Sequence, residues 1–458
     1  MNPVIVRNGM LTRSEIPRLF YIWAAVFLYA LLAMFFYRQV LLPLVEPKLW
    51  NGLIPGDPQY YHHLAAGMAE RIVKEGWSSW IFRPQGNGNV GILAAVYAVF
   101  GSNPSLIIPI NALLHSVAFL ALFGIAREHL PLRLAAVVCM PFVLSPYMIS
   151  WYSQPNKDSF VAAGVFLFLY GCIQVTKNVA HIEGKKKFWY GLISFGFGAI
   201  LISIARPYLI GILQVINWIL FPISVVFLWR VVAIKKFLSP TIAIIRVLAI
   251  AVLLIAIMPL TKSWYGNAVT WDAEYATSHP DAVSWDRTKW LPEELDYKLY
   301  GIAVTQRHTY NYLINDTNVT TREMLIDLDH KFSNATDVLE YLPRSIQIGI
   351  FAPFPNKWSF MGIPSKSVFR NFVTFEMVLI YASLVFFAIG VVKFTRDVSS
   401  YLVMLYCVPI ISLYALATPH IGALYRYRFP FILILVTLGL VVALRLWHEK
   451  DKLSDAAT

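Results

Sequence analysis

The chain has 458 residues, of which 58% are hydrophobic and only 14% are charged. Soluble domains carry about 25% charged residues, so the composition excludes an ordinary water-soluble enzyme and indicates a membrane protein. A net charge of +12 would suggest a nucleic-acid partner in a soluble protein. Here the positive-inside rule accounts for it, because Lys and Arg gather in cytoplasmic loops, and no nucleic-acid partner is expected.

About ten apolar runs are long enough to cross roughly 30 Å of hydrocarbon. Backbone amides in lipid must be hydrogen-bonded within their own segment, so these runs are helices. The predicted fold class is therefore an all-α polytopic membrane protein. The predicted spans are 19–44, 105–126, 133–151, 159–176, 188–205, 207–229, 243–261, 371–392, 398–418 and 429–446. The run 90–100 is too short to cross and predicts a re-entrant or interfacial helix.

Basic residues set the predicted orientation. They precede the first run and follow the second, fourth, sixth and eighth runs, so all of them lie on one side if the N-terminus lies there too. That side is the cytoplasm, and an even number of spans returns the C-terminus to it. We therefore expect a multi-pass protein of the inner (plasma) membrane with both termini cytoplasmic, whose first run is an uncleaved anchor.

Three parts follow from this topology. Residues 1–261 form an N-terminal transmembrane module that carries the first outer loop, 46–90. Residues 262–370 form a small extracytoplasmic subdomain, and residues 371–458 form the C-terminal transmembrane helices.

The first outer loop carries a candidate catalytic carboxylate. Asp57 opens a predicted amphipathic helix of about 18 residues that would lie in the interface plane. Near a helix N-terminus the dipole favours a carboxylate, so Asp57 is a helix cap, a catalytic group or both. Tyr61 and His62 on this helix, and Arg83 later in the loop, are candidate substrate- or phosphate-binding residues.

Two further positions place charges at the outer ends of spans. Lys157 and Asp158 lie between two apolar runs, where polar groups are usually functional, although an interfacial salt bridge with a capping Asp158 is an equal alternative. Arg206 is flanked by apolar residues and precedes Pro207, which breaks a helix. Arg206 is either a site residue or an arginine whose head reaches the interface.

The tight outer loop 419–428 contains arginines on the side where positive charge is not expected. Tyr425, Arg426 and Arg428 are therefore candidate substrate-binding residues. The guanidinium fork suits phosphate, and the tyrosines could stack on a sugar or belong to the aromatic belt.

Together these positions predict carboxylates and cations at the outer membrane surface. A carboxylate, Asp57 or Asp158, could deprotonate an acceptor hydroxyl. Cations could stabilise the charge that develops on a departing phosphate. This is the chemistry of sugar transfer from a lipid-linked phosphate. The pattern indicates no resident metal centre and requires no cofactor, and a divalent cation beside phosphate is compatible with it.

The layout resembles the GT-C superfamily of membrane glycosyltransferases over roughly residues 50–210. An acidic residue follows the first span, a Tyr-rich helix follows it, and the apolar stretch 91–101 ends in Phe-Gly, as in that superfamily. The segment 425–430 is similar to the Arg-x-Arg-x-Pro end of several members. The resemblance implies inverting transfer from a polyprenyl-phosphate-linked sugar, with Asp57 matching the family's acidic residue and Asp158 a second one. The layout is similar to the protein-mannosyltransferase-like and bacterial polysaccharide-biosynthesis types, and the Lys157-Asp158 sequence looks more like the bacterial type.

Alternatives to this reading stay open. The leading hypothesis is a glycosyltransferase whose acceptor is a glycan or lipid at the periplasmic face. A polymerase of O-antigen or exopolysaccharide units would use lipid-diphosphate-linked repeats instead. A flippase or transporter would predict mid-bilayer charges and a repeat between halves, neither of which the sequence displays.

Overall fold

The computed structural model describes residues 15–45, 49–179, 184–235, 241–259, 283–314, 324–327, 330–358, 368–394 and 397–455. Within these ranges the regular structure is helical, apart from isolated bridges that join Trp50 to Leu53 and Leu325 to His420. Nine helices of this described part are long and apolar enough to cross a membrane. The prediction of an all-α polytopic protein is confirmed.

The chain divides into two compact units that are described separately. Unit 1 comprises Met1–Thr261, Ser365–Val403 and Leu433–Thr458, and unit 2 comprises Lys262–Pro364 and Met404–Ile432. The long helices of the chain are α1 (Glu15–Phe36), α5 (Ile107–Arg127), α9 (Asp158–Asn178), α10 (Lys185–Ala205), α11 (Pro207–Lys235), the helix Thr241–Pro259, α17 (Val368–Lys393), α18 (Val398–Ala417) and α19 (Ile421–Asp455).

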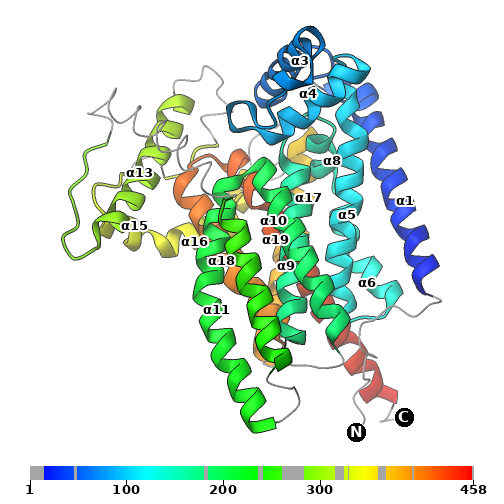
Figure 1. Ribbon diagram of the computed structural model, residues 1–458, viewed down its shortest axis with the longest axis vertical. Helices are drawn as coiled ribbons and strands as arrows, with labels where there is room; N and C mark the ends of the chain where they lie inside the picture. The colour runs from blue at the N-terminus through cyan, green and yellow to red at the C-terminus, as the bar shows by residue number, and fades with distance from the viewer. Residues whose placement is uncertain are drawn as a thin grey trace. The chain divides into compact units, whose positions relative to one another are not determined.

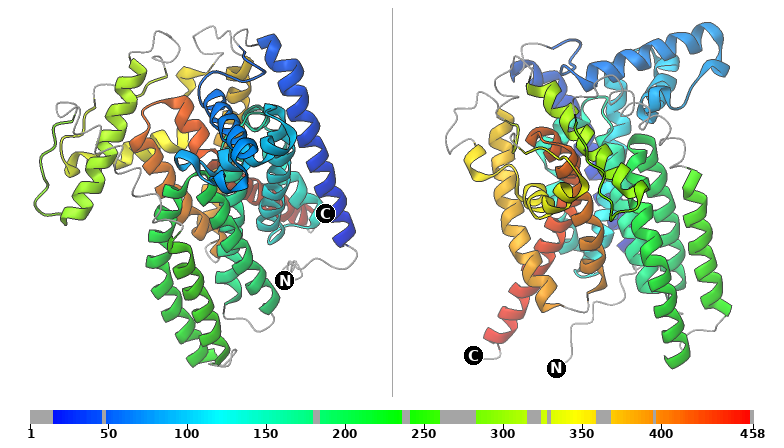
Figure 2. Two further views of the ribbon diagram at one scale, coloured as in Figure 1. Left: turned by 45° about the horizontal axis from the view of Figure 1, so that its top comes forward. Right: turned by 90° about the vertical axis from the view of Figure 1, so that its left-hand side faces the viewer.

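In unit 1, the helices α1, α5, α9 and α10 run side by side (Figure 1). The short predicted run near residue 90 is the helix α4 (Gly88–Phe100). Helix α3 (Asp57–Glu75) lies across this group of long helices (Figure 2, right) and packs against α4. This arrangement agrees with the predicted interfacial helix, because the long helices would cross the bilayer while α3 lies in its plane.

The predicted span 133–151 is broken into short helices. It forms α6 (Leu132–Val138), α7 (Met140–Val143) and α8 (Pro146–Tyr152). Prolines at the starts of α7 and α8 cause the breaks, because proline has no amide hydrogen to continue the preceding helix. The prediction of one continuous helix here is wrong.

This broken segment nevertheless returns along the full length of α5. Helix α6 contacts α5 near its end, and the ring of His115 in the middle of α5 stacks on Phe142 at 4.3 Å. At the start of α5, the Asn111 amide donates to the backbone oxygen of Tyr152 at 2.7 Å. The segment therefore crosses alongside α5 in three short pieces and delivers the next loop to the end where α5 begins.

Helices α9 and α10 are in close contact along a seam of glycines. A side-chain carbon at Gly171 would lie 2.6 Å from the backbone oxygen of Gly191, and one at Gly198 would lie 2.6 Å from that of Gly164. Small residues at such interfaces let helix backbones approach closely. Because the two helices are antiparallel, residues that precede Gly164 on α9 lie beside residues that follow Gly198 on α10. This arrangement brings Asp158 opposite the last residues of α10.

Unit 2 combines α13 (Glu293–Ile314), α15 (Ala335–Glu340) and α16 (Leu342–Phe351) with the adjoining parts of α18 and α19. The hydroxyl groups of Ser345 on α16 and Ser412 on α18 are hydrogen-bonded at 2.5 Å. The indole of Trp285 donates to Asp296 of α13 at 3.0 Å. The first contact joins α16 to α18, and the second fixes the segment before α13 to that helix.

Candidate active site

Asp57 lies at the first residue of α3 and is exposed. Gly56 precedes it with a φ of 98°, a conformation that glycine adopts without strain and that lets the chain turn sharply into the helix. At this position the carboxylate faces the positive end of the helix dipole. It lies one helical turn before Tyr61 and on the same helix face.

Lys157 lies beside Tyr61, as its ammonium nitrogen is 5.1 Å from the centre of the tyrosine ring. The loop before Lys157 is tied to the loop before α3 by Gln154. Its side-chain oxygen accepts from the backbone nitrogen of Ile54 at 3.3 Å, and its nitrogen donates to the backbone oxygen of Gly52 at 3.2 Å. Two loops about 100 residues apart in sequence therefore form one surface that carries Asp57 and Lys157.

Asp158 and Arg206 form a buried ion pair. The Arg206 guanidinium donates to Oδ1 of Asp158 at 3.1 Å, and Arg206 is only 5% exposed. The predicted helix break at Pro207 is confirmed, because α10 ends at Ala205, Arg206 has a non-helical backbone, and α11 begins at the proline. Arg206 does not reach toward solvent, so the interfacial alternative for this arginine is wrong.

Arg83 joins the same end of α10. Its guanidinium donates to the hydroxyl oxygen of Ser203, one turn before Arg206, at 3.1 Å. Burial lowers the pKa of Arg83, and the ordinary value is so high that the group stays charged. Arg83, Lys157 and Arg206 are thus brought to one region of unit 1, as the sequence analysis expected of site residues.

His62 points away from this group into the interior. Its Nδ1 is 2.8 Å from the hydroxyl oxygen of Tyr97 on α4, and its ring lies 5.5 Å from that of Trp50. Burial, with smaller contributions from His63 and Arg38, lowers the pKa of His62 to about 4. His62 is therefore neutral near pH 7 and joins α3 to α4, which is a packing role and not contact with an outer ligand.

Two polar residues that were not predicted from the sequence hold this loop in place. Arg38 lies in the π-helical turn Tyr37–Leu41 that follows α1, and it donates to the backbone oxygens of Pro104 at 3.1 Å and Ser153 at 3.0 Å. Asn111 donates to the backbone oxygen of Gln154 at 3.2 Å. An arginine and an asparagine inside apolar runs could have indicated these positions, because polar residues within membrane spans usually have a structural or functional role.

An acidic residue in a candidate span was also missed. Glu376 on α17 accepts a hydrogen bond from the Ser145 hydroxyl at 2.5 Å. Ser145 in turn caps α8 through the backbone nitrogen of Met148. The carboxylate therefore connects α17 to the start of the short helix that leads to the Lys157 loop.

The residues near position 425 lie in a helix and not in the predicted loop. Tyr425, Arg426 and Arg428 lie in the first turns of α19, which begins at Ile421, so the prediction of an outer loop 419–428 is wrong. Buried residues at Leu424, Tyr425 and Phe429 give one apolar helix face and explain the earlier start.

Arg428 is 1% exposed and donates to the backbone oxygens of Gly349 and Ala352 at the end of α16. Its guanidinium also lies 5.5 Å from the centre of the Tyr425 ring, and Arg426 is half-buried two residues earlier. The last carbonyls of a helix have no partner within the helix, so Arg428 supplies donors to them. The structure therefore gives Arg428 backbone partners at the end of α16, and its role as a phosphate ligand stays a prediction.

The arrangement in unit 1 therefore offers one exposed carboxylate, Asp57, beside a group of cations. One of these, Arg206, is paired with Asp158, and Lys157 and Arg83 add further positive charge to the same region. Among the described residues, no group of three or more His, Cys, Asp or Glu side chains is placed to hold a metal ion. The chemistry open to the residues themselves is proton abstraction by a carboxylate and stabilisation of an anion by cations.

Comparison with known proteins adds little to this geometry. No model of a known protein family and no curated protein matches the chain. The solved structure of the archaeal oligosaccharyltransferase AglB from Archaeoglobus fulgidus, in complex with an inhibitory peptide and a dolichol-phosphate, is similar at 14% identity with a TM-score of 0.43. The match covers 95% of this chain and 52% of that one, so the chain spans about half the length of the solved protein.

Proposed function

We propose that this protein is a membrane glycosyltransferase that moves a sugar from a polyprenyl-phosphate-linked donor to a glycan or lipid acceptor at the extracytoplasmic face. One observation carries the proposal. An exposed carboxylate, Asp57, lies one helical turn from Tyr61, whose ring contacts Lys157 beside the buried Asp158–Arg206 pair. A base and cations thus meet where the ends of several candidate spans gather.

In the proposed reaction, the Asp57 carboxylate takes the proton of an acceptor hydroxyl. The hydroxyl oxygen forms a bond to the anomeric carbon while the bond from that carbon to the phosphate oxygen breaks. The electron pair of that bond leaves with the polyprenyl phosphate, whose added negative charge Lys157 and Arg83 stabilise. A single displacement of this kind inverts the anomeric configuration. The lipid tail stays in the bilayer during the step.

The test is a transfer assay in vesicles with two donors, a single sugar on polyprenyl monophosphate and a repeat unit on polyprenyl diphosphate. We expect transfer from the monophosphate donor and its loss in Asp57→Asn, by about 100-fold or more for a general base. Glu75→Gln is the matched control, because Glu75 is exposed at the other end of α3.

Transfer from the diphosphate donor alone would instead identify a polymerase. Movement of intact donor across the bilayer without transfer would identify a flippase. Full activity in Asp57→Asn would reduce this residue to a helix-terminal carboxylate without a catalytic role.

A further inference from the structure

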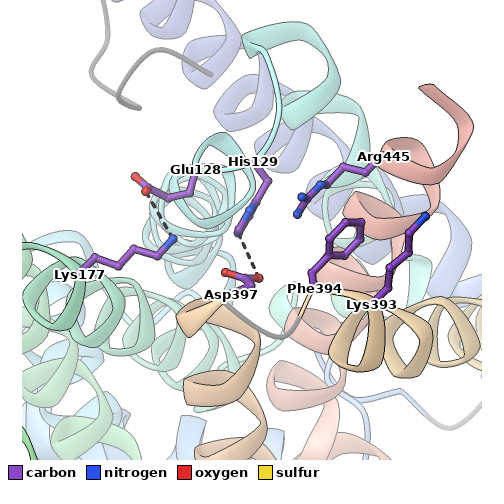
Figure 3. A pocket seen from close by; sticks show the side chains of 7 residues that line it. All are labelled: Glu128, His129, Lys177, Lys393, Phe394, Asp397 and Arg445. Carbon is purple, nitrogen blue, oxygen red and sulfur yellow. Dashed lines mark ion pairs between the residues drawn. The ribbon is translucent and has the colours of Figure 1, made fainter. Parts of the chain in front are cut away.

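Unit 1 contains a second polar site at the other end of α9. Lys177 lies 19 residues after Asp158 on this helix, roughly 28 Å away at 1.5 Å per residue. A cavity of about 550 Å³ opens there, a size typical of small-ligand sites. We call it the basic cavity, and it is lined by Glu128, His129, Lys177, Lys393, Phe394, Asp397 and Arg445 (Figure 3).

The basic cavity lies where candidate spans end. Arg127 ends one span just before Glu128, Asn178 ends a second just after Lys177, and Lys393 ends a third. Arg445 lies three residues before the end of a fourth span, at His448. The cavity therefore sits at the depth of lipid headgroups, on the face that the basic loops predict to be cytoplasmic.

The carboxylate of Glu128 is already neutralised within the protein. Its oxygens lie 3.6 Å from the ammonium nitrogen of Lys177 and 3.3 Å from that of Lys187, and the Gln174 amide donates to it at 3.1 Å. Asp397 is different. It accepts from the backbone nitrogen of Ser399 and the hydroxyl of Ser400, which begin α18, and it faces the cavity as an ionised group.

Arg445 provides unused donors on the opposite wall. Its guanidinium lies 3.7 Å from the centre of the Phe394 ring, and this stacking orients the planar fork. Within the described part of the chain, Arg445 makes no hydrogen bond and no ion pair. Lys393 lies on the same wall and is exposed (Figure 3). Arg445 thus borders the cavity with donors that no described residue accepts, and Lys393 adds a second positive charge on the same wall.

His129 adds a buried ring nitrogen that faces Asp397. Its side chain is 9% exposed, and its Nε2 lies 3.8 Å from Asp397 Oδ2, which is too long for a hydrogen bond. This buried nitrogen has no hydrogen-bond partner among the described residues. Burial lowers the pKa of His129 to about 4, against the opposite effect of Asp397, so the imidazole is neutral near pH 7. A buried polar group of this kind usually has a ligand or water as its partner.

We propose that the basic cavity binds an anionic glycerophospholipid with a polyol headgroup, independently of the reaction at Asp57. The phosphodiester oxygens accept from Arg445, and the positive charge of Lys393 on the same wall adds to the attraction. Hydroxyl groups of the headgroup donate to the Asp397 carboxylate and pair with the unused nitrogen of His129. A bare phosphate suits the cavity less well, because its charge would meet Asp397 without a donor between them. Basic pockets between transmembrane helices on this side of a membrane are established sites for acidic headgroups.

The test measures binding of short-chain lipids to the purified full chain in neutral detergent, by thermal shift and by native mass spectrometry. Phosphatidylglycerol should bind and raise the melting temperature, whereas phosphatidylcholine of the same chain length should not. Arg445→Gln should weaken phosphatidylglycerol binding at least about tenfold, as expected for loss of charged hydrogen bonds. Arg445→Lys keeps the positive charge but loses the stacked guanidinium. Its affinity for phosphatidylglycerol should lie between that of the unchanged protein and that of Arg445→Gln.

Arg133→Gln is the matched control, since Arg133 is an exposed arginine on α6, outside the cavity. Equal weakening by this control would show that general surface charge attracts the lipid and would overturn the proposal. Equal binding of phosphatidylethanolamine would overturn the requirement for an anionic headgroup. An equal rise in melting temperature with glycerol phosphate alone would show that the cavity binds a water-soluble ligand and would overturn the proposal of a lipid.

Discussion

The buried pair of Asp158 and Arg206 offers a way to separate structural from catalytic roles. In Asp158→Asn, the guanidinium of Arg206 keeps its charge but loses the carboxylate oxygen 3.1 Å away, in a position where Arg206 is only 5% exposed. In Arg206→Gln, the Asp158 carboxylate keeps its charge and loses its guanidinium partner. The double variant carries two neutral amides of nearly the same size, which can hydrogen-bond to each other.

The size of the effect follows from the geometry. Two unit charges 3.1 Å apart attract by about 5 kcal/mol at an effective dielectric constant of 20. The cost of removing both charges from water offsets most of this attraction, so the pair contributes little net stability. Removing one partner is a different matter, because it leaves a buried charge. We expect each single variant to lose about 3–5 kcal/mol and the double variant about 1 kcal/mol.

The assay combines the free energy of unfolding in micelles with sugar transfer in vesicles, for all four proteins of the cycle. Recovery of stability in the double variant together with absent transfer would assign the pair a role in catalysis beyond folding. Recovery of both would make the pair purely structural. If the single variants lose less than about 1 kcal/mol, water reaches the pair, and the argument from burial is refuted.

Two further outcomes are expected. Arg428→Gln should lower the free energy of unfolding by about 3 kcal/mol through loss of charged hydrogen bonds to the end of α16. The control Arg426→Gln should not lower it. A stable Arg428→Gln variant that binds the sugar donor more weakly would instead support Arg428 as a ligand-binding residue. For His62, the folded pKa of about 4 lies below the ordinary value, so the unfolded chain binds the proton more tightly and stability falls as pH drops from about 6.5 to 4. His62→Gln should reduce that loss in melting temperatures recorded across this range, and an unchanged pH profile would contradict it.

Local pattern was sufficient where a single segment decides its own structure. The start of α3 at Asp57 follows from a glycine, a proline and an amphipathic run, and the break after Arg206 follows from Pro207. The break within 133–151 was equally local, since Pro141 and Pro146 are visible in the sequence. Hydropathy alone does not predict this break, because proline interrupts a helix without making the run less apolar.

Partners that come from distant segments could not be read in this way. The donors of Arg428 serve backbone oxygens almost 80 residues earlier, and no local pattern states which helix end lacks partners. Charge alone does not distinguish a phosphate ligand from carbonyl partners for Arg428, because a guanidinium donates to phosphate and carbonyl oxygens alike. The burial of Arg428 and its bonds to the end of α16 depend on the fold and could not be predicted locally.

The same principle separates the two aspartates that sequence reasoning treated as a pair. Each begins a helix, so local preference for a carboxylate at a helix N-terminus explains both equally well. The difference lies in the neighbouring helix: the glycine seam holds α10 so close to α9 that Arg206 reaches Asp158, whereas Asp57 is exposed. A carboxylate that is fixed by a buried arginine is poorly suited to take a proton, because protonation would leave that arginine unpaired. Asp57 is therefore the better candidate base, and Asp158 is better suited to hold Arg206 in place.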